Sequence, residues 1–416
     1  MTLSLTARGD HWGDRTAVVD VSESRRDAPP ETIDVSRYSY ADLEVIATRF
    51  ATDLEHVGIG AGDTVCVVSR NRVRVLALFF ACHRLGVTFA PLSHRLTPAT
   101  VSRPLEALDP DLVVAEEAQS DLVREVPPSR MVALDALGSA DDTDGSDSNA
   151  DSGSDSSTDS DPPIPLLAMH DETDPHRIAT FSGDALEWTC AAVAGTLGLG
   201  RTDCTPLLLP LSAPDGLLRV VLPTLYSGGS VLLDRAFDPG DTLEALEHEP
   251  VTFLAGRETE LENLAVRDGF VDAVSGLEWV LGDVPISSGV RNAFLECDVP
   301  VLGAYGRLEC PTALVQPQSV ALEGGSNDRT GDGGGGGSDG NGGGGWFRPL
   351  FDCHARLFED DSVVTGAGEG VLEVAGPMLA TGFDDTDTVE DGERRWLTTG
   401  DRFQREEGGY RPLDLE

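Results

Sequence analysis

The stretch YSYADLEVIATRFATDLEHVGIGAGDTVCVVSRNRVRVLALFFACHRLGVTFAPLSHRLTP, residues 38–98, decides the fold class. Ser39, with Asp42 three residues later, forms a capping-box pattern, and the apolar residues that follow recur at helical spacing. Strands and helices then alternate: a strand at 64–69, a helix at 72–85, a strand at 88–90, a helix at 98–108 and a strand from 112. This order is typical of a parallel sheet covered by helices.

The second half of the chain repeats the alternation. The predicted strands lie at 178–181, 207–209, 230–233 and 251–255, and the predicted helices at 188–197, 216–226 and 241–247. From Trp346 onward, short β runs and turns replace the long helices. We therefore expect an α/β fold with two parallel-sheet subdomains, residues 1–137 and 164–323, and a small C-terminal β subdomain, residues 346–416.

Two low-complexity segments separate these parts. Residues 138–163 are rich in Ser and Asp, and residues 324–345 are rich in Gly. Neither segment can bury much apolar area, so we expect both to be disordered insertions. The Gly tract has no strand before it and no Lys after it, which favours a linker over a phosphate-binding loop.

The charge of the chain indicates a high-salt setting. The formal net charge is -42, and all 30 basic residues are Arg, since the sequence contains no Lys. The acidic stretch 138–161 holds eight Asp, so the remainder still carries -42 + 8 = -34. Such a surface repels nucleic acid and anionic lipid, and it is tolerated best where molar salt shortens the screening length to about 3 Å. We therefore expect a halophilic protein that binds neither nucleic acid nor membranes.

The cysteines and the apolar pattern suggest a reducing, cytoplasmic location. The seven Cys are scattered and form no CxxC pair. No apolar run is as long as that of a signal peptide or a membrane span. Cys353 and His354 are adjacent but have no partner at metal-ligand spacing, which favours a structural pair.

Several motifs resemble those of the AMP-forming acyl-CoA and aryl-CoA ligases, in the same order along the chain. Besides residues 38–98, these are LPLSAPDGLLRVVLPTLYSGGSVLL at 209–233, GDVPIS at 282–287, AYGRLE at 304–309 and WLTTGD at 396–401. Each motif is weak alone, but their number and order identify the chain as similar to the large domain of this adenylate-forming superfamily. In that family, ATP and an acid give an acyl-adenylate, and CoA then displaces AMP.

The resemblance implies a set of nucleotide-site residues. Tyr305 would stack on adenine, with Gly306 leaving room for the base, and Asp401 would accept hydrogen bonds from the ribose hydroxyls. The remaining implied residues are Gly282 and Asp283 at the adenine wall, Glu309 as a Mg²⁺ ligand, and Ser182 and Gly183 as what is left of the phosphate loop. The residues alone leave other roles open: a core aromatic for Tyr305, solvated acids for Asp283 and Glu309, and a turn cap for Asp401.

The sequence also departs from the family pattern. The family's Ser/Thr/Gly-rich phosphate loop with its Lys is reduced to ATFSGDALEWTC at 179–190, about six residues shorter, with Asp184 and Glu187 adding negative charge. The aromatic-His pair of the family is Ser212-Ala213, and Leu308 stands where a Thr is expected. The chain ends at GGYRPLDLE, before the small C-terminal domain that the resemblance implies.

Two functions follow as hypotheses. The first is an acid-CoA ligase that adenylates a small carboxylic acid with ATP, Mg²⁺ and CoA, impaired or completed by a separate subunit that supplies the C-terminal domain. The second is a non-catalytic homologue, a pseudoenzyme, that binds a nucleotide such as AMP, an acyl ligand or a partner enzyme. The missing Lys residues weigh against standard catalysis, because Arg supplies charge with a different geometry.

Overall fold

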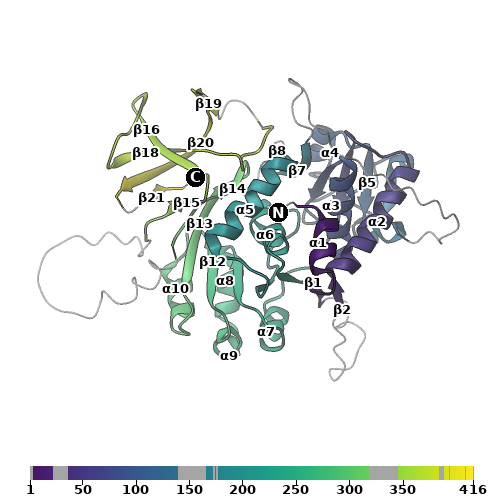
Figure 1. The fold of residues 1–416 in the computed structure, drawn as a ribbon, viewed down its shortest axis with the longest axis horizontal. Coiled ribbons are helices and arrows are strands. Elements are labelled where there is room, and N and C mark those ends of the chain that lie inside the picture. The colour runs from purple at the N-terminus through teal and green to yellow at the C-terminus, as the bar shows by residue number, and fades with distance from the viewer. Residues whose placement is uncertain are drawn as a thin grey trace, which may run out of the picture.

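The computed structural model describes residues 3–21, 36–138, 165–171, 174, 177–317, 345–383, 388–392, 394–407 and 409–415. The α/β part forms one side of the molecule, and a β-rich part formed by the C-terminal residues lies at the other end (Figure 1). This arrangement confirms the predicted fold class. Most of both predicted insertions, 138–163 and 324–345, lies outside the described residues.

The first sheet has six strands in the order β6-β5-β3-β4-β7-β8. Its pairs are parallel except for β7 and β8, which run antiparallel. The bounds are β3 Thr64–Val68, β4 Thr88–Leu92, β5 Leu112–Ala115, β6 Met131–Ala133, β7 Pro165–His170 and β8 Ile178–Ser182.

A second set of strands forms the centre of the molecule. One sheet has the order β2-β1-β10-β9 and another the order β11-β12-β13-β14-β15, and a bridge between Leu207 and Ala255 joins them. Strand β1 pairs with β10 from the second half of the chain, whereas β7 and β8 complete the first sheet. The first sheet and the sheet with the order β2-β1-β10-β9 are therefore each built from separate stretches of chain. The bounds are β1 Thr16–Asp20, β2 Ser36–Ser39, β9 Cys204–Pro206, β10 Ser230–Leu233, β11 Phe253–Gly256, β12 Trp279–Asp283, β13 Val301–Arg307, β14 Cys310–Val315 and β15 Arg348–Pro349.

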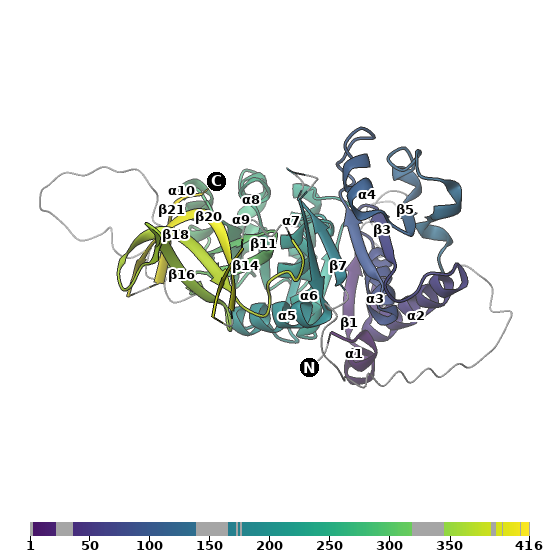
Figure 2. The ribbon, with the colours of Figure 1, turned by 90° about the horizontal axis from the view of Figure 1, so that it is seen from above.

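Helices pack against these sheets (Figure 2). The predicted capping box is confirmed: Asp42 N donates to Ser39 Oγ at 3.1 Å, and Ser39 N donates to Asp42 Oδ2 at 2.9 Å. The helix bounds are α1 Leu5–Trp12, α2 Tyr40–His56, α3 Val73–Leu85, α4 Ser102–Leu108, α5 Gly183–Leu197, α6 Leu222–Tyr226, α7 Pro239–His248, α8 Glu258–Ala265, α9 Phe270–Val274 and α10 Ser288–Leu295. Short 3₁₀ turns cover 117–119, 128–130 and 134–136.

Two predicted elements differ in the structure. The prediction of a strand at 207–209 is wrong. The strand that pairs with β10 is β9, which begins at Cys204, opposite Ser230, and ends at Pro206. The helix predicted at 216–226 is a π-helix over Asp215–Val221, labelled η4, followed by α6. Pro223 lacks the N–H that a continuous ladder needs, and π turns are frequent at functional sites.

The C-terminal part is the predicted small β subdomain. Its strands follow the order β17-β16-β18-β20-β19, with β21 on β20, and all its pairs are antiparallel. The bounds are β16 His354–Glu359, β17 Ser362–Val363, β18 Gly368–Ala375, β19 Thr388–Asp391, β20 Arg394–Glu406 and β21 Gly409–Asp414. The TTGD segment lies inside the long strand β20.

All seven cysteines are free thiols, and burial raises the pKa of several of them, Cys66 and Cys82 among them. Among the described residues, no helix combines the length and the apolar character that a membrane crossing requires.

Candidate functional site

Strands β12, β13 and β20 bring four of the expected residues to one cavity. Tyr305, Gly306, Asp283 and Asp401 all line a cavity of about 360 Å³. Tyr305 and Gly306 come from β13, Asp283 from the end of β12 and Asp401 from β20. Residues separated by about a hundred positions in the sequence are therefore neighbours at this point.

Asp401 is the centre of a buried network. Its side chain is 2% exposed, accepts a hydrogen bond from the Tyr305 hydroxyl, and forms an ion pair with Arg307 Nη2 at 2.9 Å. Burial, together with the hydrogen bond to Asp401, raises the pKa of Tyr305. The Tyr305 ring itself packs edge-on against Phe403, with 4.9 Å between the ring centroids.

Close packing against backbone requires glycine at position 306, whereas Gly282 faces only the end of a side chain. A Cβ atom on Gly306 would lie 2.1 Å from the carbonyl oxygen of Pro311, so only Gly fits between β13 and β14. A Cβ on Gly282 would lie 2.5 Å from Ile286 Cδ1. Gly282 therefore lies beneath Ile286, whereas Gly306 borders the cavity.

The π-helix contributes a second pair of charged residues. Asp215 and Arg219, one turn apart, are each 6% exposed. Arg257 binds Asp215 in a two-point contact, from Nε to Oδ2 at 2.8 Å and from Nη2 to Oδ1 at 2.9 Å. Arg219 Nη1 lies 2.5 Å from Asp283 Oδ1 and Arg219 Nε donates to Thr312 Oγ1 at 3.0 Å.

The carboxyl groups of Asp215 and Asp283 have opposite pKa shifts. Burial raises the pKa of Asp283 to about 6, and the nearby charge of Asp215 adds to this rise against the attraction of Arg219. For Asp215, burial also opposes ionisation, but the bonds from Arg257 outweigh it and lower its pKa. Burial and the neighbouring charges therefore shift the two pKa values apart, downward for Asp215 and upward for Asp283.

A second cavity of about 280 Å³ adjoins the first. The two cavities share Arg257, Asp283, Gly306 and Arg307. The second is also lined by His170 and Leu308. Four arginines surround it, and each contacts a carboxylate of the chain: Arg177 with Glu309, Arg219 with Asp283, Arg257 with Asp215, and Arg307 with Asp401.

Glu309, the expected Mg²⁺ ligand, is bound to Arg177. Its side chain is 1% exposed, and Oε1 receives both Arg177 Nε at 2.8 Å and Nη2 at 2.7 Å. Its other oxygen, Oε2, has no hydrogen-bond partner among the described residues. No group of three or more His, Cys, Asp or Glu among the described residues could hold a metal ion. A Mg²⁺ ion at Glu309 would therefore have to compete with a guanidinium group.

Ser182 and Gly183 lie at a tight strand-to-helix junction. Strand β8 ends at Ser182, α5 begins at Gly183, and Ser182 Oγ caps the helix by accepting from Ala185 N at 3.3 Å. Thr180 N also donates to Gly382 O at 2.7 Å, which ties this junction to the C-terminal part. Asp184 and Glu187 line neither cavity, and Glu187 Oε1 instead accepts from Leu3 N at 2.8 Å.

Sequence reasoning missed the four arginines. Arg219 stood out as the single charged residue within the run LLRVVLPTL, and such a residue in a buried apolar segment is a signal of pairing. For Arg177, Arg257 and Arg307 the sequence offers no comparable signal, because their partners are distant in the chain.

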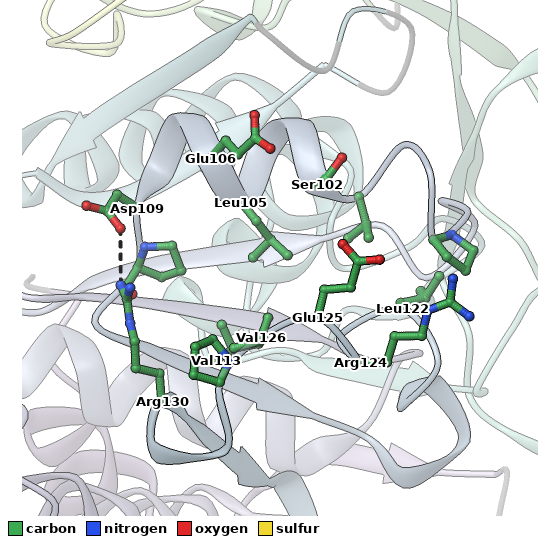
Figure 3. A pocket seen from close by; sticks show the side chains of 14 residues that line it. Ser102, Leu105, Glu106, Asp109, Val113, Leu122, Arg124, Glu125, Val126 and Arg130 are labelled. Atoms are coloured by element: carbon green, nitrogen blue, oxygen red, sulfur yellow. Dashed lines mark hydrogen bonds and ion pairs between the residues drawn. The ribbon is translucent and has the colours of Figure 1, made fainter.

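A third cavity, of about 300 Å³, lies at the edge of the first sheet and contains none of the expected residues. Figure 3 shows it between α4 and residues 122–130, with Leu105, Val113 and Val126 inside. Arg130 binds Asp109 at 3.2 Å beside it. Its lining combines these apolar side chains with charged ones, including Glu106, Arg124 and Glu125.

Comparison with known proteins relates both the sequence and the fold to one group. Residues 5–182 match the AMP-binding enzyme family. A feruloyl-CoA synthase from Amycolatopsis sp is 26% identical over 381 residues, which is 89% of this chain and 72% of that protein. The ATP-bound structure of MatB from Rhodopseudomonas palustris has a TM-score of 0.78 at 20% identity, covering 99% of this chain and 78% of that one. The N-terminal domain of FACL13 from Mycobacterium tuberculosis has a TM-score of 0.78 at 18% identity, covering 100% of both chains.

Proposed function

The chain is a relative of the AMP-binding, adenylate-forming enzymes, and from this premise we propose that it binds an adenine nucleotide without the standard Mg-ATP chemistry. One observation carries the proposal. The carboxylates that the resemblance assigns to the nucleotide and the metal, at Asp401, Asp283 and Glu309, each contact an arginine of the chain itself.

The adenosine side of the site supports binding. Tyr305, Gly306 and Asp401 border one cavity, and Arg307 beside them supplies donors to a monophosphate or a carboxylate. The side of the site expected to hold the phosphates offers fewer hydrogen-bond donors. Ser182 serves as a helix cap, and no loop separates β8 from α5. The β- and γ-phosphates of ATP would therefore have fewer donors than the family's loop provides.

The test is calorimetric titration of AMP and Mg-ATP in molar KCl. We expect AMP to bind more tightly than Mg-ATP, because each further phosphate adds charge without a matching donor. Asp401→Ala should weaken AMP binding by roughly 1.5 to 3 kcal/mol, or about ten- to hundredfold. Tyr305→Phe is the control, because it removes the hydrogen bond between Tyr305 and Asp401 but keeps the carboxylate and the aromatic ring. Tighter binding of Mg-ATP would contradict the proposal.

The second candidate function is acid-CoA ligation, and the buried, unpartnered Oε2 of Glu309 favours it, since a metal ion would satisfy this atom. Arg177→Gln would release Glu309 from its ion pair. If this candidate holds, Mg²⁺ should raise the melting temperature of Arg177→Gln, and acid-dependent pyrophosphate release should appear or increase. Arg130→Gln, at an exposed pair outside the site, is the matched control. Without an effect of Mg²⁺ or any pyrophosphate release, the ligase candidate fails.

The proposal includes the partners and the setting. A small carboxylic acid and CoA would be co-substrates of the ligase candidate. A high-salt cytoplasm is proposed from the net charge of -42 and the absence of Lys.

A further inference from the structure

A large cavity lies away from the candidate nucleotide site, between the N-terminal helix and the centre of the molecule. It has a volume of about 710 Å³, in the range of small-molecule sites, and shares no lining residue with the two cavities around Arg307. Helix α1, the C-terminal half of α5 and the end of α6 form its walls. Figure 2 shows α1 beside α5 and α6 near the N-terminus.

The cations that line this cavity are two arginines. Arg8 and Arg201 line it together with His11, and none of the described residues in its lining is Asp or Glu. This is unusual in a chain with 72 acidic residues and 30 arginines. Glu187, the acid that contributes to the field at Arg8, is bound to the backbone of Leu3. An anion that enters would therefore meet cations and no lining carboxylate.

Arg8 is built into the wall rather than extended into solvent. It is 3% exposed, and its Nη1 donates to Tyr226 O at 2.6 Å. Its guanidinium carbon lies 4.6 Å from the ring centroid of Tyr226 and 5.6 Å from that of Trp12. Burial lowers the pKa of Arg8, so a ligand anion nearby would offset part of the cost of burying its charge.

Helix α5 leaves space on the side that faces the cavity. It presents Ala191, Ala194 and Gly195 there, and a Cβ atom on Gly195 would meet no atom within 4 Å. Glycine inside a helix costs roughly 0.5–1 kcal/mol relative to alanine. Trp12 and Tyr226 therefore line the same cavity as a helix face with little side-chain bulk.

From this geometry we infer that the cavity is a second binding site, for a small planar aromatic carboxylate. Its ring would lie beside Trp12 and Tyr226 against the small residues of α5, and its carboxylate would face Arg8, His11 and Arg201. This site is separate from the proposed nucleotide site and does not depend on it.

The probe is 2-naphthoate, with the neutral 2-naphthamide as its matched control, titrated in molar KCl. Binding is followed by quenching of Trp12 fluorescence, obtained as the difference between the wild type and Trp12→Phe. Gly195→Leu should fill the cavity and weaken 2-naphthoate at least tenfold, whereas Gly195→Ala should bind as the wild type does. Arg201→Gln should weaken 2-naphthoate about three- to tenfold without changing 2-naphthamide.

Two results would overturn the inference. One is equal affinity for 2-naphthoate and 2-naphthamide, because the cations would then have no role. The other is 2-naphthoate binding that survives Gly195→Leu but is lost in Arg257→Gln, which would place the acid in the nucleotide-site cavities. AMP titration of Gly195→Leu keeps the two proposals apart, since AMP binding should be unchanged in this variant.

Discussion

At the scale of single residues, the chain contains arginine and no lysine, and four arginines form ion pairs with carboxylates at the candidate site. The two-point contact of Arg257 with Asp215 uses the planar guanidinium, which an ammonium group could not reproduce. Removing Arg257 would leave the buried carboxylate of Asp215 without this partner, although water screens part of the cost because the Arg257 side chain is 37% exposed. Ligand binding at Asp401 or Glu309 therefore requires an exchange of partners.

The raised pKa of Asp283 predicts a pH dependence of stability. Because its pKa is about 6 in the folded protein and 3.8 in its reference state, the folded protein binds more protons than the unfolded chain between about pH 4 and 6. Stability from this group is thus present below about pH 4 and is lost as pH rises through 6. Asp283→Asn removes the carboxylate that pairs with the buried Arg219, which lowers stability throughout this range. Its side chain stays neutral, however, so its stability relative to the wild type should rise by about 1–2 kcal/mol between pH 4 and 7.

Urea unfolding in molar KCl at pH 4, 5, 6 and 7 measures this difference. Asp272→Asn, an exposed acid on α9, is the control and should show no trend. The lowered pKa of Asp215 acts in the opposite direction, with stability lost as pH falls below the reference value of 3.8, so its effect lies outside this range. A wild-type to Asp283→Asn difference that stays constant over pH 4–7 would contradict the assignment.

At the scale of elements, the junction between β8 and α5 separates this chain from the pattern of the family it resembles. The strand passes directly into the helix at Gly183, and the Ser182 side chain is used as an N-cap. Four free N–H groups at a helix start can bind an anion, but here Ser182 already satisfies the N–H of Ala185. Ser182, which the resemblance assigns to phosphate binding, therefore serves in this junction as a helix cap.

Ser182→Ala should thus lower stability by about 1 kcal/mol, as the loss of an N-cap does, without a change in AMP affinity. Ser39→Ala is the matched control, since Ser39 caps α2 in the same way and lies in neither cavity around Arg307. Unfolding in urea and calorimetric titration of AMP measure the two quantities for each variant. A loss of AMP affinity in Ser182→Ala alone would assign Ser182 to the phosphate after all.

At the scale of the whole molecule, the net charge of -42 sets the conditions under which the fold is stable. Arginines that surround the candidate site are engaged with carboxylates, and the acids elsewhere outnumber the remaining cations. Repulsion among these carboxylates is long-range in dilute buffer, where the Debye length at 0.1 M is about 10 Å, and short-range in molar salt, where it is about 3 Å.

The melting temperature should therefore be lower in 0.1 M than in 3 M KCl, by about 10 °C or more. A non-ionic osmolyte such as sorbitol at matched osmolality is the control, and it should not replace the salt. Thermal unfolding followed by circular dichroism measures both. An equal melting temperature at the two salt concentrations would remove the basis for the halophilic setting.

The sequence by itself determined the α/β class, the capping box of α2 and the order of motifs from residue 38 to Asp401, because periodicity, turns and caps are local properties. Tertiary structure alone decided that β1 joins the sheet of β10, since strand pairing depends on contacts between distant segments. It also paired Asp401 with Arg307 and Glu309 with Arg177. Which cation neutralises a buried carboxylate is set by three-dimensional proximity, and for these pairs no spacing in the sequence encodes it.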